Sequence, residues 1–410
     1  MNGKRRVVIT GCGVISALGL SRGELFESLL RGASAVRRMV EWKPTADGKI
    51  PLGAPLILPE QEIRKIPRQY RRSMGDLSLF AALAAMQALE ESGLDADVCS
   101  SGRCGCVIGS TMGSSNSIAE AFRILLHGEG MGGMPATQFF KCASHSASFN
   151  VANLLNLTGC VQSASAACAS GLQAIGTARD LIASGTQDAV LCGGAEELSP
   201  EVTGSFELLF AGASEYNHSP ADSSRPFDAG RTGLVCGEGA GILMLEEYEH
   251  ARKRGARILA EVRGYATCCS SRLSQSDASA IRRCMNLACS DAGISPDVLD
   301  YISAHATATV QGDAEEAGAL RGFLRRSTPV SSLKGHLGHT LGASGALELA
   351  VTLEMMERSV LLPTRNLETV SEECGGLDHI RSARESEINV FLKNSFAFGG
   401  INANLICSKL

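Results

Sequence analysis

One cysteine of the chain lies in a sequence context that suits a nucleophile. Cys168 is one of 15 cysteines among 410 residues, and an ordinary buried cysteine is only a small apolar side chain. After Cys168, the apolar residues Leu172, Ile175, Ala178 and Ile182 recur at helical spacing. The pattern predicts that Cys168 lies at the start of a helix. The partial positive charge there favours a thiolate, and the free N–H groups can bind an oxyanion.

Two of the eight histidines also lie in unusual surroundings. His305 follows the strand-like residues 299–303 and precedes ATATVQGD, a turn of small and polar residues that is typical of the end of a strand. His339 lies in the glycine-rich segment SSLKGHLGHTLGASGALE, where backbone or ligand can approach closely. We predict an acid–base role for both. His336 and His339 could share a helical face as metal ligands, but no third ligand is evident nearby, so we expect no metal.

A lysine and a glutamate flank the same glycine-rich segment. If Lys334 and Glu348 form a pair at the surface, their interaction contributes little energy. If the pair is buried, it fixes the geometry of the site. The sequence leaves both alternatives open.

Short apolar runs before glycine-rich turns predict the buried strands of a covered sheet. These strands must position the residues named above. The runs are residues 7–10, 106–108, 189–192, 241–245 and 390–392. Helix-period segments occur at 78–92 and 278–293, and the second ends in a glycine that suits a helix C-cap. The alternation predicts an α/β fold in layers. The helix-like EEYEHARKRG predicts a domain boundary near residue 255.

Composition excludes several classes of function. The net charge is −5 and the basic residues are scattered, which argues against nucleic-acid binding. No apolar stretch has the length of a membrane helix, and glycines interrupt the N-terminal MNGKRRVVITGCGVISALG, which predicts a strand and a turn. The odd number of cysteines, without recurring CxxC pairs, favours a reducing compartment. We therefore expect a soluble, cytoplasmic protein that binds neither nucleic acid nor membranes.

Seven segments resemble, in the same order, the β-ketoacyl-[acyl-carrier-protein] synthases I and II of the thiolase superfamily. They are VVITGCGVIS, SASAACASG, AVLCGGAEE, SSRPFDAGRTGLVCGEGAGILMLEEYEHARKRGA, YISAHATATVQGD, VSSLKGHLGHTLGASGALE and NSFAFGGINANL. The resemblance implies the α/β thiolase fold, with five layers (αβαβα) and two duplicated βαβαβαββ halves. Residues 1–255 would carry the nucleophile and residues 256–410 both catalytic histidines.

The resemblance also implies a set of catalytic groups. Cys168, His305 and His339 would form a Cys-His-His triad, whereas other branches of the superfamily use a second cysteine or an asparagine in place of one histidine. The main-chain N–H groups of Cys168 and Phe398 would form the oxyanion hole.

Further residues would support the histidines or the substrate. By resemblance, Lys334 and Glu348 form a structural pair, and Thr307 and Thr309 donate hydrogen bonds to the pantetheine arm. Four motifs depart from the family: HGTST reads HATAT, STK reads SLK, FGFGGTN reads FAFGGIN and DAYHMT has become SSRLSQ. The last change places Leu273 near the position of a family histidine.

The resemblance implies an acyltransferase, a 3-oxoacyl-[acyl-carrier-protein] synthase. It would condense an acyl-cysteine with malonyl-ACP, with loss of carbon dioxide, in fatty acid or type II polyketide or polyene elongation. We expect no cofactor on the chain itself, since 4′-phosphopantetheine belongs to the acyl carrier protein.

The resemblance implies a dimer through strands near residues 161–165, either with itself or with a ketosynthase-like chain-length partner. A first alternative is that this chain is the non-catalytic chain-length partner, but such partners lack the cysteine. A CoA-dependent or thiolase-type acyltransferase is a second alternative.

Overall fold

The N-terminal half of the chain forms a five-stranded mixed sheet. The structure is a computed structural model that describes residues 5–410 except 46–47, 129, 214 and 272–276. The strands are β1 (Val7–Ser16), β4 (Cys104–Gly109), β5 (Val161–Ala164), β6 (Ala189–Glu196) and β7 (Gly239–Glu247). Their order is β5-β4-β6-β7-β1, with β4 parallel to β5 and β6, and β7 antiparallel to β6 and β1.

The C-terminal half repeats this sheet. Its strands are β8 (Ala260–Cys269), β9 (Tyr301–Ser303), β10 (Pro329–Ser331), β14 (Val390–Phe396) and β15 (Ile401–Ser408). Their order is β10-β9-β14-β15-β8, with the same parallel and antiparallel pairings as in the first half. The predicted duplication is therefore confirmed. A short antiparallel pairing of β1 with β8 joins the two sheets, and β12 (Asp378–His379) extends the outer edge of the second.

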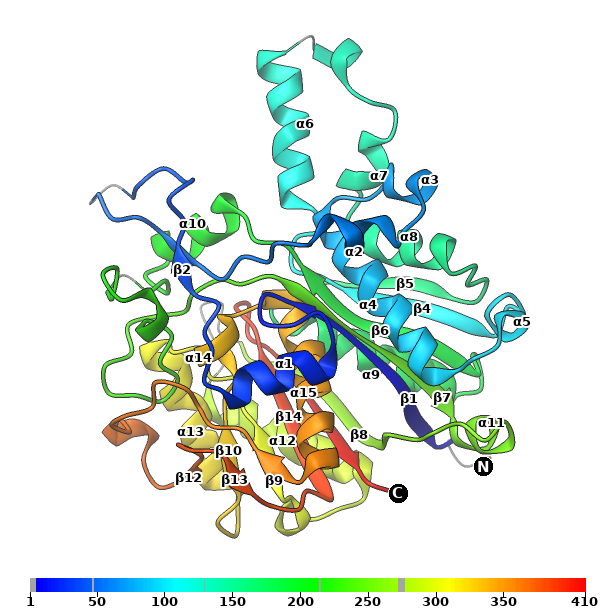
Figure 1. Cartoon of the computed structure of the whole chain (residues 1–410). Helices are drawn as coiled ribbons and strands as arrows, with labels where there is room; N and C mark the ends of the chain where they lie inside the picture. The colour runs from blue at the N-terminus through cyan, green and yellow to red at the C-terminus, as the bar shows by residue number, and fades with distance from the viewer. Residues whose placement is uncertain (1–4, 46–47, 129, 214, 272–276) are drawn as a thin grey trace.

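Helices complete the five predicted layers (Figure 1). The central helices α9 (Ser170–Ala183) and α15 (Ser344–Arg358) contact strands of both sheets and each other. The helices α4 (Asp76–Ser92) and α8 (Ser146–Leu154) cover the outer face of the first sheet. The helix α12 (Ala278–Ala292) covers the second sheet, and α13 (Val310–Phe323) packs against α12. The expected five-layered α/β fold is confirmed.

Glycines allow the layers to meet at one point near the start of α9. A Cβ atom on Gly194 of β6 would lie 2.2 Å from the carbonyl oxygen of Gly342, and one on Gly171 would lie 2.5 Å from the same oxygen. Backbone from both halves thus comes into direct contact, which side chains at these positions would prevent. This contact brings the segments before α9 and α15 together.

The predicted strands and helices lie within observed elements. The five predicted apolar runs fall in β1, β4, β6, β7 and β14. The helices predicted at 78–92 and 278–293 match α4 and α12, and Gly293 is the C-cap of α12 with a φ of 65°. The boundary near residue 255 stays a prediction; there the chain passes from α11 (Tyr248–Lys253) to β8.

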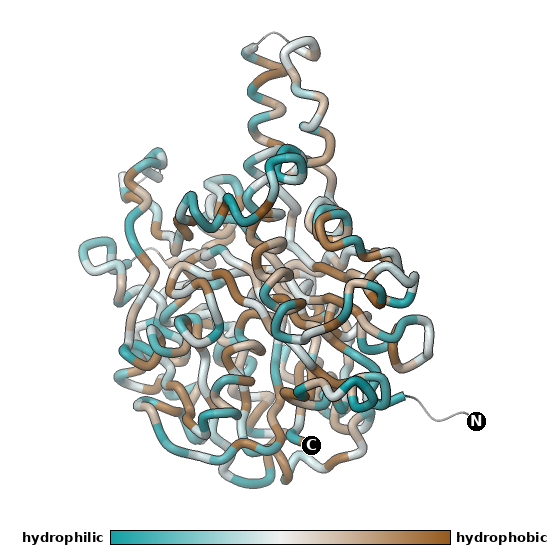
Figure 2. The backbone as a smooth tube through the Cα atoms, turned by 45° about the vertical axis from the view of Figure 1, so that its right-hand side comes forward, coloured by the Kyte–Doolittle hydropathy of each residue, from teal (hydrophilic) through white to brown (hydrophobic). Residues whose placement is uncertain are grey.

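A helical extension projects from the body of the molecule (Figure 1). It consists of α6 (Ser115–His127), η1 (Gly130–Gly133) and α7 (Gln138–Cys142). Figure 2 shows hydrophobic residues along it. Other helices are α1 (Arg22–Leu30), α2 (Glu60–Arg64), α3 (Arg68–Arg71), α5 (Ala96–Cys99), α10 (Pro200–Leu208) and α14 (Lys334–Leu337). Other strands, of two residues each, are β2 (Arg37–Arg38), β3 (Leu52–Gly53), β11 (Val360–Leu361) and β13 (Arg384–Glu385). Of the helices that are described, none is both long and apolar enough to cross a membrane.

Candidate active site

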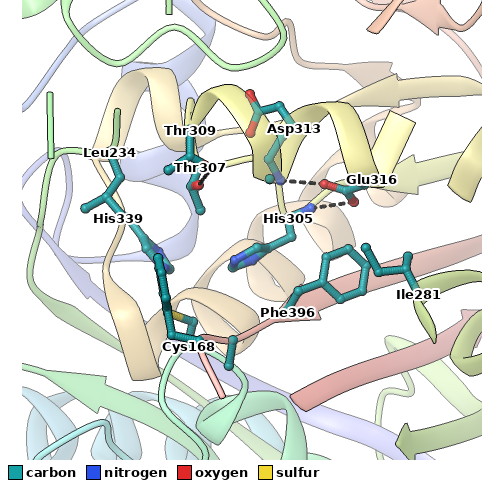
Figure 3. A pocket seen from close by; sticks show the side chains of 14 residues that line it. Cys168, Leu234, Ile281, His305, Thr307, Thr309, Asp313, Glu316, His339 and Phe396 are labelled. Carbon is teal, nitrogen blue, oxygen red and sulfur yellow. Dashed lines mark hydrogen bonds between the residues drawn. The ribbon is translucent and has the colours of Figure 1, made fainter. Parts of the chain in front are cut away.

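Segments from both halves surround a pocket with an empty volume of about 500 Å³. Its lining includes Cys168, Leu234, Ile281, His305, Thr307, Thr309, His339, Phe396 and Phe398. Most of these residues follow the carboxyl end of a strand or precede a central helix. In Figure 3 the side chains of Cys168, His305 and His339 point toward one another. The three residues that the sequence singles out for chemistry are thus brought together.

Cys168 lies just before helix α9, as predicted, with Ala169 as the N-cap. The turn is tight, because Ala167 has a φ of 47°, a region that is unfavourable for a residue with a Cβ. Cys168 is only 2% exposed. Burial raises the pKa of its thiol to about 12, and the charge of Lys334 only partly opposes this. The prediction that the helix start favours a thiolate is therefore wrong for the resting protein, since burial outweighs it.

The two histidines are close to each other and to the cysteine. Their ring centroids are 5.2 Å apart and the ring planes are inclined by 82°. The Cys168 sulfur and a nitrogen of each ring all lie within 4.8 Å of one another. Burial lowers the pKa of both imidazoles well below the ordinary value, and the charge of Lys334 adds to the effect. Both rings are therefore neutral at neutral pH, and each has one N–H to donate and one lone pair to accept.

A buried glutamate holds the backbone at His305. Glu316 of α13 accepts the N–H of His305 at 2.9 Å and the N–H of Ala306 at 2.7 Å (Figure 3). Asn394 of β14 donates a third hydrogen bond to Glu316 at 2.9 Å, and Asn404 donates to Asn394 at 2.7 Å. Glu316 was not predicted from the sequence. An acid in the apolar face of a helix, eleven residues after His305, was the available signal.

His339 is held by the N-terminal half. Its N–H donates to the carbonyl of Val235 at 2.7 Å, and its own carbonyl accepts from Gly237 at 2.9 Å. Three residues on, Gly342 donates its N–H to Glu196 at 2.9 Å, and the same carboxylate accepts from Thr111 at 2.8 Å. Glu196, also missed from sequence, thus links loops of both halves. None of the described residues is hydrogen-bonded to either ring nitrogen of His339.

The lysine–glutamate pair is buried, which decides between the two alternatives. Lys334 Nζ lies 2.6 Å from Glu348 Oε1, and the two side chains are 1% and 3% exposed. A second buried lysine, Lys393 of β14, contacts the other carboxylate oxygen of Glu348. Lys393 was not predicted from the sequence. Its signal was the one charged residue within the strand VFLKNSF.

The other predicted residues also line the pocket. The hydroxyls of Thr307 and Thr309 are 3.1 Å apart. Phe398 lies in the turn after β14, and its ring contacts that of Phe206 in α10, with centroids 5.7 Å apart. Leu273 lies outside the described residues.

One set of residues has the chemistry to bind a metal ion. Within the described ranges, Cys168, His305 and His339 are the one group of three potential ligands whose donor atoms lie this close together. His336 is not part of it, since its Nδ1 is hydrogen-bonded to the carbonyl of Ala33 at 2.8 Å. We interpret the three groups as a nucleophile with two acid–base partners, because the thiol lies at a helix start and all three line one pocket.

Comparison with known families supports this interpretation. The model of the "Beta-ketoacyl synthase, N-terminal domain" matches residues 4–251, and that of the C-terminal domain matches residues 259–368. The chain belongs to the β-ketoacyl synthase family. This β-ketoacyl synthase is 35% identical over 405 residues to 3-oxoacyl-[acyl-carrier-protein] synthase 1 of Haemophilus influenzae, and the match covers 98% of each chain.

Solved structures of the family have the same fold. A crystal structure of a β-ketoacyl synthase from Burkholderia phymatum STM815 is 41% identical, with a TM-score of 0.92 over 99% of this chain and 100% of that one. A type II PKS acyl-carrier protein in complex with its ketosynthase bound to the hexaketide gives 31% identity and a TM-score of 0.90 over 99% and 100%. The β-ketoacyl synthase described here is therefore similar both to a 3-oxoacyl-[acyl-carrier-protein] synthase and to a type II PKS ketosynthase.

Proposed function

We propose that the chain is a 3-oxoacyl-[acyl-carrier-protein] synthase, an acyltransferase that extends an acyl chain with malonyl-ACP. The observation that carries the proposal is the convergence of the Cys168 thiol and the imidazoles of His305 and His339 within 4.8 Å in one pocket. The membership of the chain in the β-ketoacyl synthase family supports it. The reaction belongs to chain elongation in fatty acid or type II polyketide synthesis.

In the first half-reaction, the acyl group moves to the enzyme. The Cys168 sulfur attacks the carbonyl carbon of an acyl thioester, and its proton passes to a neutral imidazole. The main-chain N–H groups of Cys168 and Phe398 donate hydrogen bonds to the tetrahedral oxyanion. The thioester of the carrier then breaks, its pantetheine thiol leaves with a proton, and acyl-Cys168 remains.

In the second half-reaction, malonyl-ACP loses carbon dioxide. His305 and His339 donate N–H groups to the thioester oxygen and stabilise the enolate that forms as the C–C bond breaks. The α-carbon of this enolate attacks the acyl-cysteine carbonyl, the bond to sulfur breaks, and the departing thiolate takes a proton from solvent. The products are 3-oxoacyl-ACP, carbon dioxide and free Cys168. The low pKa of both imidazoles supports this role, because it keeps them neutral.

The carrier supplies the only prosthetic group that this mechanism needs. The 4′-phosphopantetheine arm is attached to the acyl carrier protein and enters the pocket with the substrate. The hydroxyls of Thr307 and Thr309 line the pocket and would donate hydrogen bonds to the amides of the arm. Free thiols at all 15 cysteines support a cytosolic location.

We place a second copy of this chain against the outer edge of β5. This strand ends the sheet, residues 161–163 are exposed, and an unpaired edge is a template for another strand. The extension beside it carries exposed apolar side chains: Phe122 (58%), Leu126 (72%), Met131 (83%) and Phe139 (70%). Such a surface is typical of a two-fold interface.

Light scattering tests this assembly. We expect a dimer at micromolar concentration and a monomer for the double variant Phe122→Asp/Leu126→Asp. The matched control is Glu120→Gln on the same helix, whose side chain is 45% exposed, and it should remain dimeric. A monomeric wild-type protein would overturn the homodimer. It would favour a heterodimer with a chain-length partner.

Mass spectrometry tests the activity directly. After incubation with a panel of acyl carrier proteins, we expect an acyl adduct on Cys168, and with malonyl-ACP we expect a 3-oxoacyl product and carbon dioxide. Equal or better acyl transfer from acyl-CoA would favour a CoA-dependent transferase. Carrier binding without any acyl adduct would favour the non-catalytic chain-length partner, which the presence of all three triad residues disfavours.

A further inference from the structure

A second lysine lies behind the two histidines, fully buried in the C-terminal sheet. Lys393 is 0% exposed. Its Nζ contacts one oxygen of Glu348 and donates to the carbonyl of Ala304 at 3.3 Å. Because Lys334 pairs with the other oxygen of Glu348, two ammonium groups share one carboxylate. Ala304 directly precedes His305, so Lys393 is hydrogen-bonded to the backbone one residue before this histidine.

Strand geometry gives Lys393 and its neighbour complementary positions. Successive side chains of a strand point to opposite faces of the sheet. Lys393 accordingly reaches Glu348 of the central helix α15, whereas Asn394 reaches Glu316 of α13. Glu316 in turn holds the N–H groups of His305 and Ala306. Lys393 therefore holds the carbonyl of Ala304 directly. Its neighbour Asn394 supports the Glu316 carboxylate, which holds the two N–H groups of the same segment.

Beside the imidazoles, two ammonium groups share the Glu348 carboxylate, and a second carboxylate, that of Glu316, also acts on Lys393. The groups that face it are Glu348, Lys334, Glu316, His305 and His339. Glu348 compensates only one of the two ammonium groups. The carboxylate of Glu316 lies on the other face of the strand and accepts three N–H groups. Both lysines lower the pKa of each imidazole.

Stability does not account for this arrangement. Burying an ammonium group carries a large desolvation penalty, and apolar side chains of similar volume are often equally or more stabilising than a buried ion group. Burial lowers the pKa of Lys393 itself to about 8, in spite of the nearby carboxylate. The strand thus contains a charge that the packing of the core does not require.

We propose that Lys393 is a positioning residue of the condensation site, which anchors Ala304 beside His305 and keeps both imidazoles in their neutral, hydrogen-bonding form. The inference rests on the proposed function for its catalytic meaning. Its electrostatic part is independent of activity. Removal of a neighbouring positive charge makes an imidazolium easier to form, so loss of Lys393 raises the pKa of His305 and His339.

Two variants separate the two parts of this role. Lys393→Gln removes the charge but keeps a donor for the Ala304 carbonyl, and Lys393→Met removes both. With ¹³C-labelled histidine, NMR titration should show the site imidazoles titrating about one pH unit higher in both variants, a tenfold change in the protonated fraction. The acid limb of kcat/KM should move by the same amount. Only Lys393→Met should also lower kcat on the plateau, by about tenfold.

The result that overturns the proposal is an unchanged pH profile and unchanged imidazole titration in both variants. A uniform loss of activity without a pH shift would show a merely structural lysine. Lys65→Gln is the control, since the Lys65 side chain is 57% exposed and paired with Glu62, and it should leave both readouts unchanged. Imidazole shifts in a protein that forms no 3-oxoacyl product would overturn the proposed function and leave the charge effect intact.

The unmodified enzyme provides a test if neither variant folds. As Lys393 loses its proton around pH 8, the resonances of His305 and His339 should change between pH 7 and 9, although the imidazoles themselves titrate far lower. The two resonances are assigned by their loss in His305→Asn and His339→Asn. Resonances that stay constant over this range would contradict the charge coupling.

Discussion

The two halves of the molecule have the same strand order but bring different groups to the pocket. In the N-terminal half, the segment between the third strand and the central helix α9 carries Cys168. In the C-terminal half, the corresponding segment before α15 carries His339. After the second strand, the first half has Thr111 and the second has His305. The nucleophile therefore comes from one half, and both acid–base groups come from equivalent positions in the other.

The buried carboxylates of the two halves also have different roles. Glu196, at the end of the fourth strand of the first half, accepts backbone N–H groups from Thr111 and Gly342. In the second half, Glu348 is paired with two lysines and Glu316 supports the backbone of His305. The first half thus uses its acid to join the halves, and the second uses its acids to set the charge and position of the histidines. The duplicated fold provides the positions, and the side chains decide the chemistry.

The largest effect is expected when the nucleophile, which the first half contributes, is removed. Cys168→Gln should lower condensation by on the order of a thousandfold or more, because no acyl-enzyme can form. Malonyl-ACP decarboxylation should remain, because the histidines of the second half are intact. Carbon dioxide release and the 3-oxoacyl product are measured in parallel. If condensation persists, the nucleophile is a different residue.

The opposite experiment removes one group from the second half. His305→Ala or His339→Ala should lower decarboxylation by about a hundredfold or more, the typical loss for one oxyanion donor. Cys168 should still accept an acyl group slowly. His379→Ala, at the outer edge of the same half and hydrogen-bonded to Cys374, is the control and should decarboxylate normally. Wild-type rates in both site variants would make them structural histidines.

Much of this division was predictable from sequence. The apolar runs and helical spacings predicted the layered α/β fold, and local context selected Cys168, His305 and His339 from 15 cysteines and eight histidines. These features depend on neighbours along the chain. The duplicated halves and the full set of site residues came from the resemblance to a family.

The sequence did not reveal groups that act across the fold. Glu316 and Lys393 reach the segment at His305 only because α13 and β14 pack beside it. The ionisation of Cys168 was predicted in the wrong direction, because a helix start is visible in sequence but the burial of its first turn is not. Burial and long-range contacts are tertiary quantities, and they decide the charge state of the site.

A third prediction concerns the support of His305. Glu316→Gln replaces an acceptor of three N–H groups by an amide that can place an N–H against a donor. We expect the free energy of unfolding to fall by about 1–3 kcal/mol and kcat to fall by about tenfold, with KM little changed. The matched control is Glu315→Gln, the preceding residue, which accepts one N–H from Ala278 at 2.7 Å. Equal losses of kcat in the two variants would contradict a specific role for Glu316.

The smallest expected effect is the order in which the cysteines are alkylated. Cys168 is 2% exposed and its pKa is raised to about 12, whereas Cys269 is exposed. Peptide mapping with iodoacetamide at neutral pH should therefore find Cys269 modified first. For Cys168, the thiolate fraction grows as pH rises toward its pKa, so its rate should increase about tenfold per pH unit from pH 7 to 10. A rate that reaches a plateau below pH 8 would show that the positive end of α9 outweighs burial. The N-terminal half would then supply an activated thiolate by itself, stabilised by the start of α9, and the histidines of the second half would not be needed to take the proton of Cys168.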